Sequence, residues 1–408
     1  SDIYNFKWTI NADGKILHEG VLDVPSVKPH QSADVNIPLP TVKEESATEY
    51  FLHLTACTKS RTPLVPEEHI TASAQWTLPV EVSQSKVPAV ERFLPDTNPS
   101  GHVWQFSEEK NMITFTSSDA VISFSKTNGE LTNYVTNNKE YILEGLRPNF
   151  WRPMTDNDVA NGTGERCKTW KKAGERLVLK EFLYKLSENK QQGIISATYS
   201  MPEQESVCHV NYTIYADGII KTVFSFEPGN KALPEIPRFG MRIILKKEYE
   251  NMTWLGRGPH ENYWDRKNSA DISLYKATVW EQYHPYVRAQ ETGNKSDVRW
   301  AALQNKEGDG LLIKATDIPL SVSAWNFPME DIMYIPSTVK NIHGGSIERK
   351  PMVWLNIDSR QMGVGGDNTW GAKTHPEYTI TPTVQSYGFL IIPVNGTDNL
   401  PEKAKLFR

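Results

Sequence analysis

The sequence predicts an all-β protein, and three features of the chain lead to this prediction. Apolar and polar residues alternate over short segments, as they do in strands with one buried face. Turn-forming pairs separate several of these segments, at Asp13-Gly14, Asn128-Gly129 and Asp217-Gly218. Helical periodicity is weak, and strands do not alternate with helices as a βα barrel requires. We therefore expect antiparallel strands stacked as sandwiches.

The first domain is predicted over residues 1–80 as an immunoglobulin-like sandwich. Alternating apolar residues on both sides of Asp13-Gly14 indicate a hairpin. Further strands are predicted at 50–56 and 71–78, where β-branched and aromatic residues recur.

The next segment, 81–100, is predicted to be a linker because Pro, Ser, Glu and Asn recur there without periodicity. Residues 101–408 then form one large domain, in which so many antiparallel strands need two stacked sheets to bury their apolar faces. The strands expected in this domain cover residues 112–115, 121–124, 131–135, 210–215, 219–226, 240–245, 311–315, 320–325, 353–357 and 388–394.

The composition is that of an ordinary folded chain and excludes several function classes. The chain has 408 residues, is 38% hydrophobic and carries a net charge of −5. Its basic residues are scattered, so neither a nucleic acid nor a membrane is an expected partner. No apolar run is long enough to span a membrane, and no targeting segment is visible. We expect a soluble protein, and a cytoplasmic and a periplasmic location both agree with the sequence.

The cysteines and most aromatic residues are expected in the core. Cys57, Cys167 and Cys208 are odd in number and lack the spacing of metal ligands, which predicts buried free thiols. The twelve tryptophans exceed what a core of this size needs, although most of them would still fill a sandwich.

Two segments, 254–266 and 362–371, combine aromatic and polar residues with glycine. Glycine allows positive φ and close approach of the backbone to a ligand, so we expect the rings of both segments to face solvent. A pyranose has an apolar face that lies well on an aromatic ring and a rim of hydroxyls that needs polar partners. The two segments therefore favour sugar binding.

These segments resemble the C-terminal region of the large β-galactosidases of glycoside hydrolase family 2. That family has runs of the type W-x-G-x-G-P-x-E-N-Y-x-D-R and G-x-G-G-D-x-x-W. The resemblance implies an immunoglobulin-like linker domain lacking its first strand or strands, followed by a galactose-mutarotase-like β-supersandwich. Supporting matches occur in the family's order at 8–14, 70–78, 152–158, 170–174, 283–286, 291–293 and 354–358.

The resemblance also implies a function that depends on an absent part. The family performs retaining hydrolysis of terminal β-D-galactosides with two glutamates on a catalytic barrel, and nothing in this chain resembles that barrel. We expect the chain alone to be inactive and to have no cofactor. Its expected partners are galactoside sugars and the barrel, carried by the same parent chain or by a separate large subunit. A divalent or monovalent cation and an oligomeric state of the parent enzyme both agree with the resemblance.

Trp370 is the main candidate site residue. A Trp in a glycine-rich loop is either a stacking platform or an anchor that pins the loop. The resemblance implies stacking on the substrate sugar, because Trp370 falls on the matching motif position. Asp367 and Asn368 are expected to support the loop.

Five charged residues have structural and functional interpretations. Asp156 and Asp158 are spaced so that they could hold a hard cation, although such runs more often cap a turn. Glu261, Asp265 and Arg266 are expected to form an ion-pair network beneath a loop.

Two alternative functions are kept. The chain could be a stand-alone carbohydrate-binding module. It could also be an aldose 1-epimerase-like enzyme, since epimerases share the expected fold and use acid/base groups, for which His260, His284 and Glu291 are the candidates. A fold does not confer an activity, and none of these three lies in a run that resembles an epimerase motif.

Overall fold

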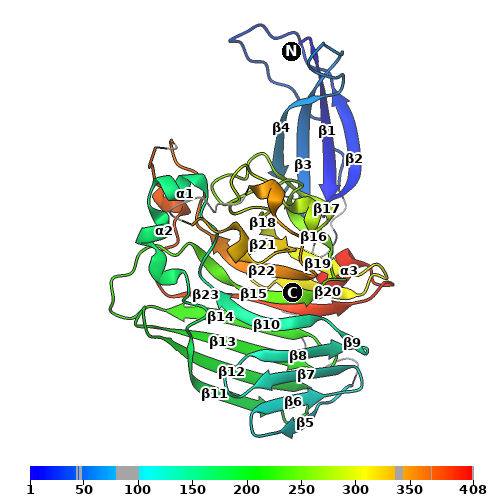
Figure 1. Ribbon diagram of the computed structural model, residues 1–408. Coiled ribbons are helices and arrows are strands. Elements are labelled where there is room, and N and C mark those ends of the chain that lie inside the picture. The colour runs from blue at the N-terminus through cyan, green and yellow to red at the C-terminus, as the bar shows by residue number, and fades with distance from the viewer. Residues whose placement is uncertain (43–44, 46–47, 80–100, 336–342, 369, 407–408) are drawn as a thin grey trace. The chain divides into compact units, whose positions relative to one another are not determined.

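The computed structural model describes residues 1–42, 45, 48–79, 101–335, 343–368 and 370–406 (Figure 1). The described residues form two compact units. The first lies within Ser1–Glu91 and includes Asp271–Leu274, and the second lies within Arg92–Ala270 and Tyr275–Arg408. The predicted linker at 81–100 lies outside the described residues, and the predicted domain boundaries stay predictions.

The first unit contains one four-stranded antiparallel sheet in the order β2-β1-β3-β4. One face of this sheet buries Trp8, Ile10 and Leu52. Among the described residues, Ile37 and Val42 from the segment after β2 pack against this cluster, in the place where a sandwich would put a second sheet. The strands are β1 (Tyr4–Ala12), β2 (Lys15–Leu22), β3 (Tyr50–Thr58) and β4 (Ile70–Thr77).

The largest sheet has nine strands in the order β11-β12-β13-β14-β23-β20-β19-β16-β17, and all of it except Asp271–Leu274 of β17 belongs to the second unit. These strands are β11 (Val178–Leu186), β12 (Gln192–Met201), β13 (Ser206–Tyr215), β14 (Ile220–Glu227), β16 (Asn251–Gly258), β17 (Asp271–Thr278), β19 (Trp300–Gln304), β20 (Gly310–Ala315) and β23 (Gln385–Val394).

Two five-stranded sheets complete the strands of this unit. One has the order β10-β15-β22-β21-β18, and the other has the order β5-β6-β7-β8-β9. The strands of the first are β10 (Ile142–Asn149), β15 (Arg238–Lys246), β18 (Lys295–Val298), β21 (Leu320–Trp325) and β22 (Met352–Gln361). The strands of the second are β5 (Gln105–Glu108), β6 (Met112–Thr116), β7 (Ala120–Ser125), β8 (Leu131–Thr136) and β9 (Lys139–Glu140).

Aromatic side chains join the sheets of the second unit into one core. Phe224 of β14 stacks on Phe239 of β15 with ring centroids 4.9 Å apart. Phe124 of β7 lies 5.1 Å from Tyr212 of β13, so the second five-stranded sheet also packs on the nine-stranded sheet. Each such ring contributes roughly 1.5–3 kcal/mol when it leaves water. The predicted all-β supersandwich is confirmed.

Helices are few and short in the described chain, as the weak periodicity predicted. Among the described residues, no helix has the length and apolar character needed to cross a bilayer. The α-helices are α1 (Asp156–Ala160), α2 (Thr163–Arg166) and α3 (Leu400–Lys405), and the 3-10 turns are η1 (Lys168–Trp170), η2 (Trp280–Gln282), η3 (Met329–Ile332), η4 (Gly344–Ser346) and η5 (Pro376–Tyr378).

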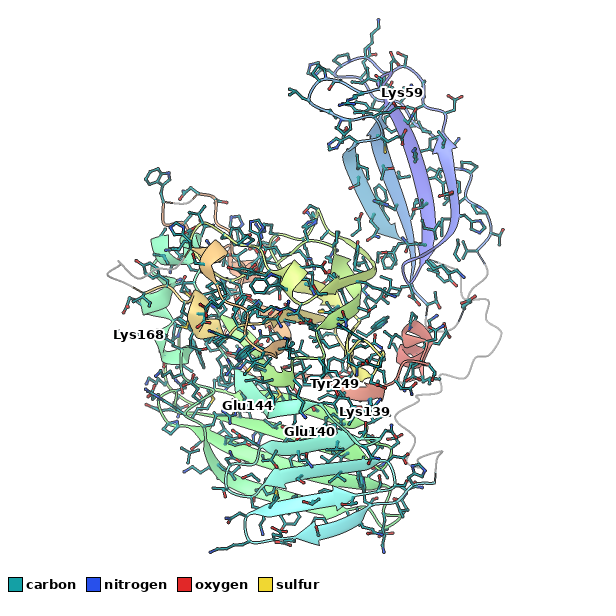
Figure 2. The ribbon with its side chains drawn as sticks, turned by 45° about the vertical axis from the view of Figure 1, so that its right-hand side comes forward. Lys59, Lys139, Glu140, Glu144, Lys168 and Tyr249 are labelled. Atoms are coloured by element: carbon teal, nitrogen blue, oxygen red, sulfur yellow. The ribbon has the colours of Figure 1, made fainter. Side chains whose placement is uncertain are left out.

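Figure 2 shows Glu140 of β9 near Tyr249, whose hydroxyl donates to the Glu140 carbonyl at 3.3 Å.

The structure confirms the prediction for the cysteines and contradicts the prediction for segment 254–266. All three cysteines are free and buried, as predicted. The expectation that the rings of segment 254–266 face solvent is wrong, because Trp254 and Tyr263 are each only 1% exposed. Trp254 lies on β16, where Gly256 serves close packing: a Cβ there would lie 2.8 Å from the Cα of Val298. Glycine at this position allows two strands to approach and does not present a ring to solvent.

Candidate functional site

The candidate site is the glycine-rich loop that carries Trp370. The Trp370 side chain is 92% exposed, so the loop displays the ring. The Asn368 side-chain oxygen accepts a hydrogen bond from the backbone N–H of Trp370 at 2.9 Å. Asp367 pairs with His375 at 2.8 Å, and this partner raises the pKa of His375. Both Asp367 and Asn368 therefore make contacts within the loop region.

The base of this loop is held by three side chains from two distant parts of the chain. The Asp265 carboxylate accepts hydrogen bonds from the N–H groups of Val364 at 3.0 Å and Gly365 at 2.7 Å. Arg152 Nη2 donates to the Gly363 carbonyl at 3.1 Å, and Asn157 Nδ2 donates to the Val364 carbonyl at 3.1 Å. The loop base is thus fixed while the ring at position 370 stays exposed.

Glycine at position 363 is required by this arrangement. A Cβ there would lie 2.7 Å from the Asp265 carboxyl group and 2.5 Å from the Thr374 hydroxyl. The sequence interpretation singled out Asp265 but missed Arg152 and Asn157 as loop supports. The only sequence signal for these two was their position in the segment 152–158.

We expect Asp265→Asn to loosen the loop base. An amide has one acceptor oxygen and no charge, so one of the two backbone N–H groups loses its partner, at a cost of about 1–3 kcal/mol. Hydrogen exchange of the Val364 and Gly365 amides should accelerate. Asp367→Asn is the matched control, because Asp367 is exposed and pairs with the His375 side chain. Equal exchange in the two variants would contradict this role of Asp265.

A polar pocket of about 220 Å³ lies beside the loop base. Glu261 accepts hydrogen bonds in it from Thr292 Oγ1 at 3.1 Å, the Gly293 N–H at 2.8 Å and the Tyr286 hydroxyl. Arg266 Nη2 lies 2.8 Å from Glu261, so the expected ion pair between them is present. The pocket is lined by Thr155, Asp156, Asn157, Glu261, Tyr263, Arg266, Tyr286, Gln290, Glu291 and Val364.

Asp156 and Asp158 face separate cationic partners. Asp158 is buried, lies 3.1 Å from Arg152 and closes a capping box with Thr155 at the start of α1. Asp156 pairs with Arg288 and accepts from Gln290 Nε2 at 3.0 Å. Carboxylates that already face guanidinium groups do not fit a shared cation. The described residues contain no group of three His, Cys, Asp or Glu side chains that could hold a metal ion, and the cation of the parent enzyme stays a prediction.

Glu291 belongs to a fully buried ion network. Arg238 lies 3.1 Å from Glu291 and 3.2 Å from Asp358, and all three side chains are 0% exposed. One guanidinium cannot fully compensate two buried carboxylates. Burial accordingly raises the pKa of Glu291, and it raises the pKa of Asp358 to about 8.

The raised pKa of Asp358 predicts a pH-dependent stability. In the folded chain Asp358 keeps its proton at pH values above 3.8, where the unfolded chain has released it. The resulting contribution to the unfolding free energy is complete below pH 3.8 and is lost as the pH rises through about 8. Asp358→Asn mimics the protonated acid and should flatten the decrease in unfolding free energy across this range. Urea unfolding at several pH values measures it, with the exposed Asp317→Asn as control. Parallel pH profiles of the wild type and Asp358→Asn would refute the assignment.

The three candidates for epimerase-like chemistry have separate surroundings. His260 Nε2 lies 3.1 Å from the Ser269 hydroxyl, and the His284 ring lies edge-on to Tyr286 at 4.3 Å. Glu291 is buried against Arg238. No contact described in the structure joins the three directly, and the acid/base set stays a prediction.

Comparison with known families gives two matches. Residues 116–391 match the family described as beta galactosidase small chain, and residues 1–79 match domain 4 of beta-galactosidase. The chain is 34% identical to a beta-galactosidase of Priestia megaterium over 92% of this chain and 34% of that protein. It is 29% identical to a beta-galactosidase of Lactobacillus delbrueckii subsp. bulgaricus over 93% of this chain and 35% of that protein. The chain thus spans about a third of the length of these curated relatives.

Solved structures give a more distant match. A galactose mutarotase related enzyme from Lactobacillus acidophilus aligns with a TM-score of 0.37 and 10% identity over 72% of this chain and 98% of that one. A galactose 1-epimerase from Lactobacillus acidophilus aligns with a TM-score of 0.39 and 8% identity over 72% of this chain and 99% of that one.

Proposed function

This chain belongs to the β-galactosidase small-chain family, and from that membership we propose that it is the C-terminal portion of a β-galactosidase and completes its active site. The complete enzyme would carry out retaining hydrolysis of terminal β-D-galactosides. The catalytic region would lie on the same parent chain or on a separate large subunit. The observation that carries the proposal is the 92% exposed Trp370 on a loop whose base is anchored.

The anchored loop favours a ligand platform over a packing anchor. A Trp that pinned the loop would be buried, whereas this ring is almost fully exposed. The hydrogen bonds of Asp265 and Arg152 hold the backbone at residues 363–365, so the ring extends from a fixed base. Pre-organisation of this kind lowers the entropy cost of stacking on the apolar face of a sugar.

The surroundings of the buried carboxylates support inactivity of the chain alone. A retaining glycosidase needs two carboxylates about 5 Å apart on either side of the glycosidic bond. Glu291 and Asp358 share Arg238, and because Asp358 is 0% exposed a sugar cannot lie between the two. We infer that the catalytic pair is supplied by the rest of the enzyme.

Hydrolysis of a chromogenic β-galactoside tests this proposal. The full-length parent enzyme should turn over the substrate. The 408-residue chain alone should show only the rate of spontaneous hydrolysis in buffer. Robust turnover by the purified chain would contradict the proposal, because it would require a catalytic carboxylate pair within this chain.

A further inference from the structure

A second pocket of about 240 Å³ lies in the large unit, beside strands β18, β21 and β22. No residue lines both this pocket and the pocket beside the Trp370 loop. Its lining includes Trp264, Arg360 and Gln361, with the apolar residues Ile318 and Pro319 also on its wall.

Arg360 is held in place by an aromatic ring. Its guanidinium lies over the Trp264 ring, 5.0 Å from the ring centroid. The Trp264 ring is in turn held by an edge contact with Tyr378 at 5.8 Å. Within the described chain, Arg360 forms no ion pair with a carboxylate. A stacked guanidinium presents a planar fork of donors, which suits a carboxylate.

The carboxylate in the pocket wall, Asp297, is already paired with two cations. Lys267 Nζ donates to both oxygens of Asp297, at 3.0 and 2.9 Å. Arg257, which also pairs with Asp297, adds a second cation to the same carboxylate. An anion entering the pocket would therefore meet a net positive surface, with Arg360 as its unpaired cation.

Gln361 adds a buried acceptor that has no partner. The side chain is 2% exposed, and its Nε2 donates to Glu291 Oε1 at 3.2 Å and to Asn294 Oδ1 at 3.0 Å. Because both neighbours are oxygens, the amide nitrogen must face them, and Oε1 remains without a hydrogen bond. This oxygen is buried as well, so Gln361 closes the wall of the pocket and does not itself contact a ligand. Ser359, which also lines the pocket, adds a hydroxyl with no partner among the described residues.

We propose that this pocket binds a hexopyranose that carries a carboxylate, that is, a hexuronate. Arg360 pairs with the carboxylate, the Ser359 hydroxyl binds a sugar hydroxyl, and Ile318 contacts the apolar face of the ring. A single sugar ring is the ligand size that suits a small pocket of this kind. The proposal is independent of galactoside hydrolysis and does not involve Trp370.

Titration of the 408-residue chain with galacturonate, followed by NMR, tests the proposal. Galacturonate should bind at millimolar concentration, and galactose, its neutral counterpart, should bind at least about tenfold more weakly. Added salt should weaken the binding of galacturonate, because the interaction is between charges. No binding of galacturonate, or equal binding of the two sugars, would overturn the proposal.

Variants locate the binding. Arg360→Met keeps the apolar contact with Trp264 and should weaken galacturonate binding about tenfold or more. Arg349→Met is the matched control, because Arg349 lies over another tryptophan ring, Trp280, at 5.9 Å and does not line the pocket. Thermal unfolding verifies that both variants fold. If Arg360→Met does not fold, Ser359→Ala provides a second, smaller perturbation of the pocket.

Trp370→Ala separates this inference from the proposed function. It should leave galacturonate binding by the chain unchanged. Loss of binding in Trp370→Ala, or retention of full affinity in a folded Arg360→Met or Ser359→Ala variant, would place the ligand elsewhere and overturn the assignment to this pocket.

Discussion

Replacing Trp370 with alanine in the full-length enzyme is expected to lower kcat/KM for galactosides about 30-fold while leaving folding unchanged. The ring is 92% exposed, so its removal creates no cavity and costs little stability. Stacking on a sugar removes the apolar surface of both partners from water, which contributes about 2 kcal/mol for a ring of this size. Steady-state kinetics with a chromogenic galactoside measures the loss.

Two variants control for this experiment. Trp370→Phe keeps an aromatic ring and should retain much of the activity. Trp76→Ala removes another exposed tryptophan, 50% exposed on β4 of the first unit, and should leave the kinetics unchanged. Galactoside kinetics of Trp370→Ala that match those of the wild type would defeat the proposed role of this residue.

Arg238→Met is expected to destabilise the chain by about 3–5 kcal/mol. The substitution leaves Glu291 and Asp358 buried without their shared cation, and each must then accept a proton or remain charged in an apolar core. Urea unfolding followed by tryptophan fluorescence measures the change in unfolding free energy.

Arg147→Met is the matched control for this prediction. Arg147 also pairs with two carboxylates, Glu130 and Glu144, but its side chain is 44% exposed. An exposed pair contributes about 0–1 kcal/mol, so the two arginine variants should differ several-fold in their effect. Similar losses in both variants would mean that burial of the Arg238 network does not govern its contribution.

The sequence predicted strands of two kinds, those with alternating burial and those such as β21 whose residues are all buried. β13 shows regular alternation before its final residues, and β13 and β14 are joined through the Asp217-Gly218 turn. β19, with four buried residues in succession, and β12, which alternates regularly, were both missed, so burial pattern alone does not separate predicted from missed strands. Segment 254–266 was misread because its glycines were taken to present rings to solvent, whereas Gly256 on β16 allows close strand packing.

The sequence alone determined the fold class, the burial of the free cysteines and the motif that carries Trp370, because periodicity, composition and short motifs are local properties. Only the tertiary structure decided which distant residues meet. Asp265 and Arg152 are separated by more than a hundred positions, yet both hold the backbone of the Trp370 loop. Arg238 meets Glu291 and Asp358, and Trp264 and Arg360 come together at one pocket, through strand register and sheet packing. These contacts depend on how strands pair across the whole chain, and no local pattern records that pairing.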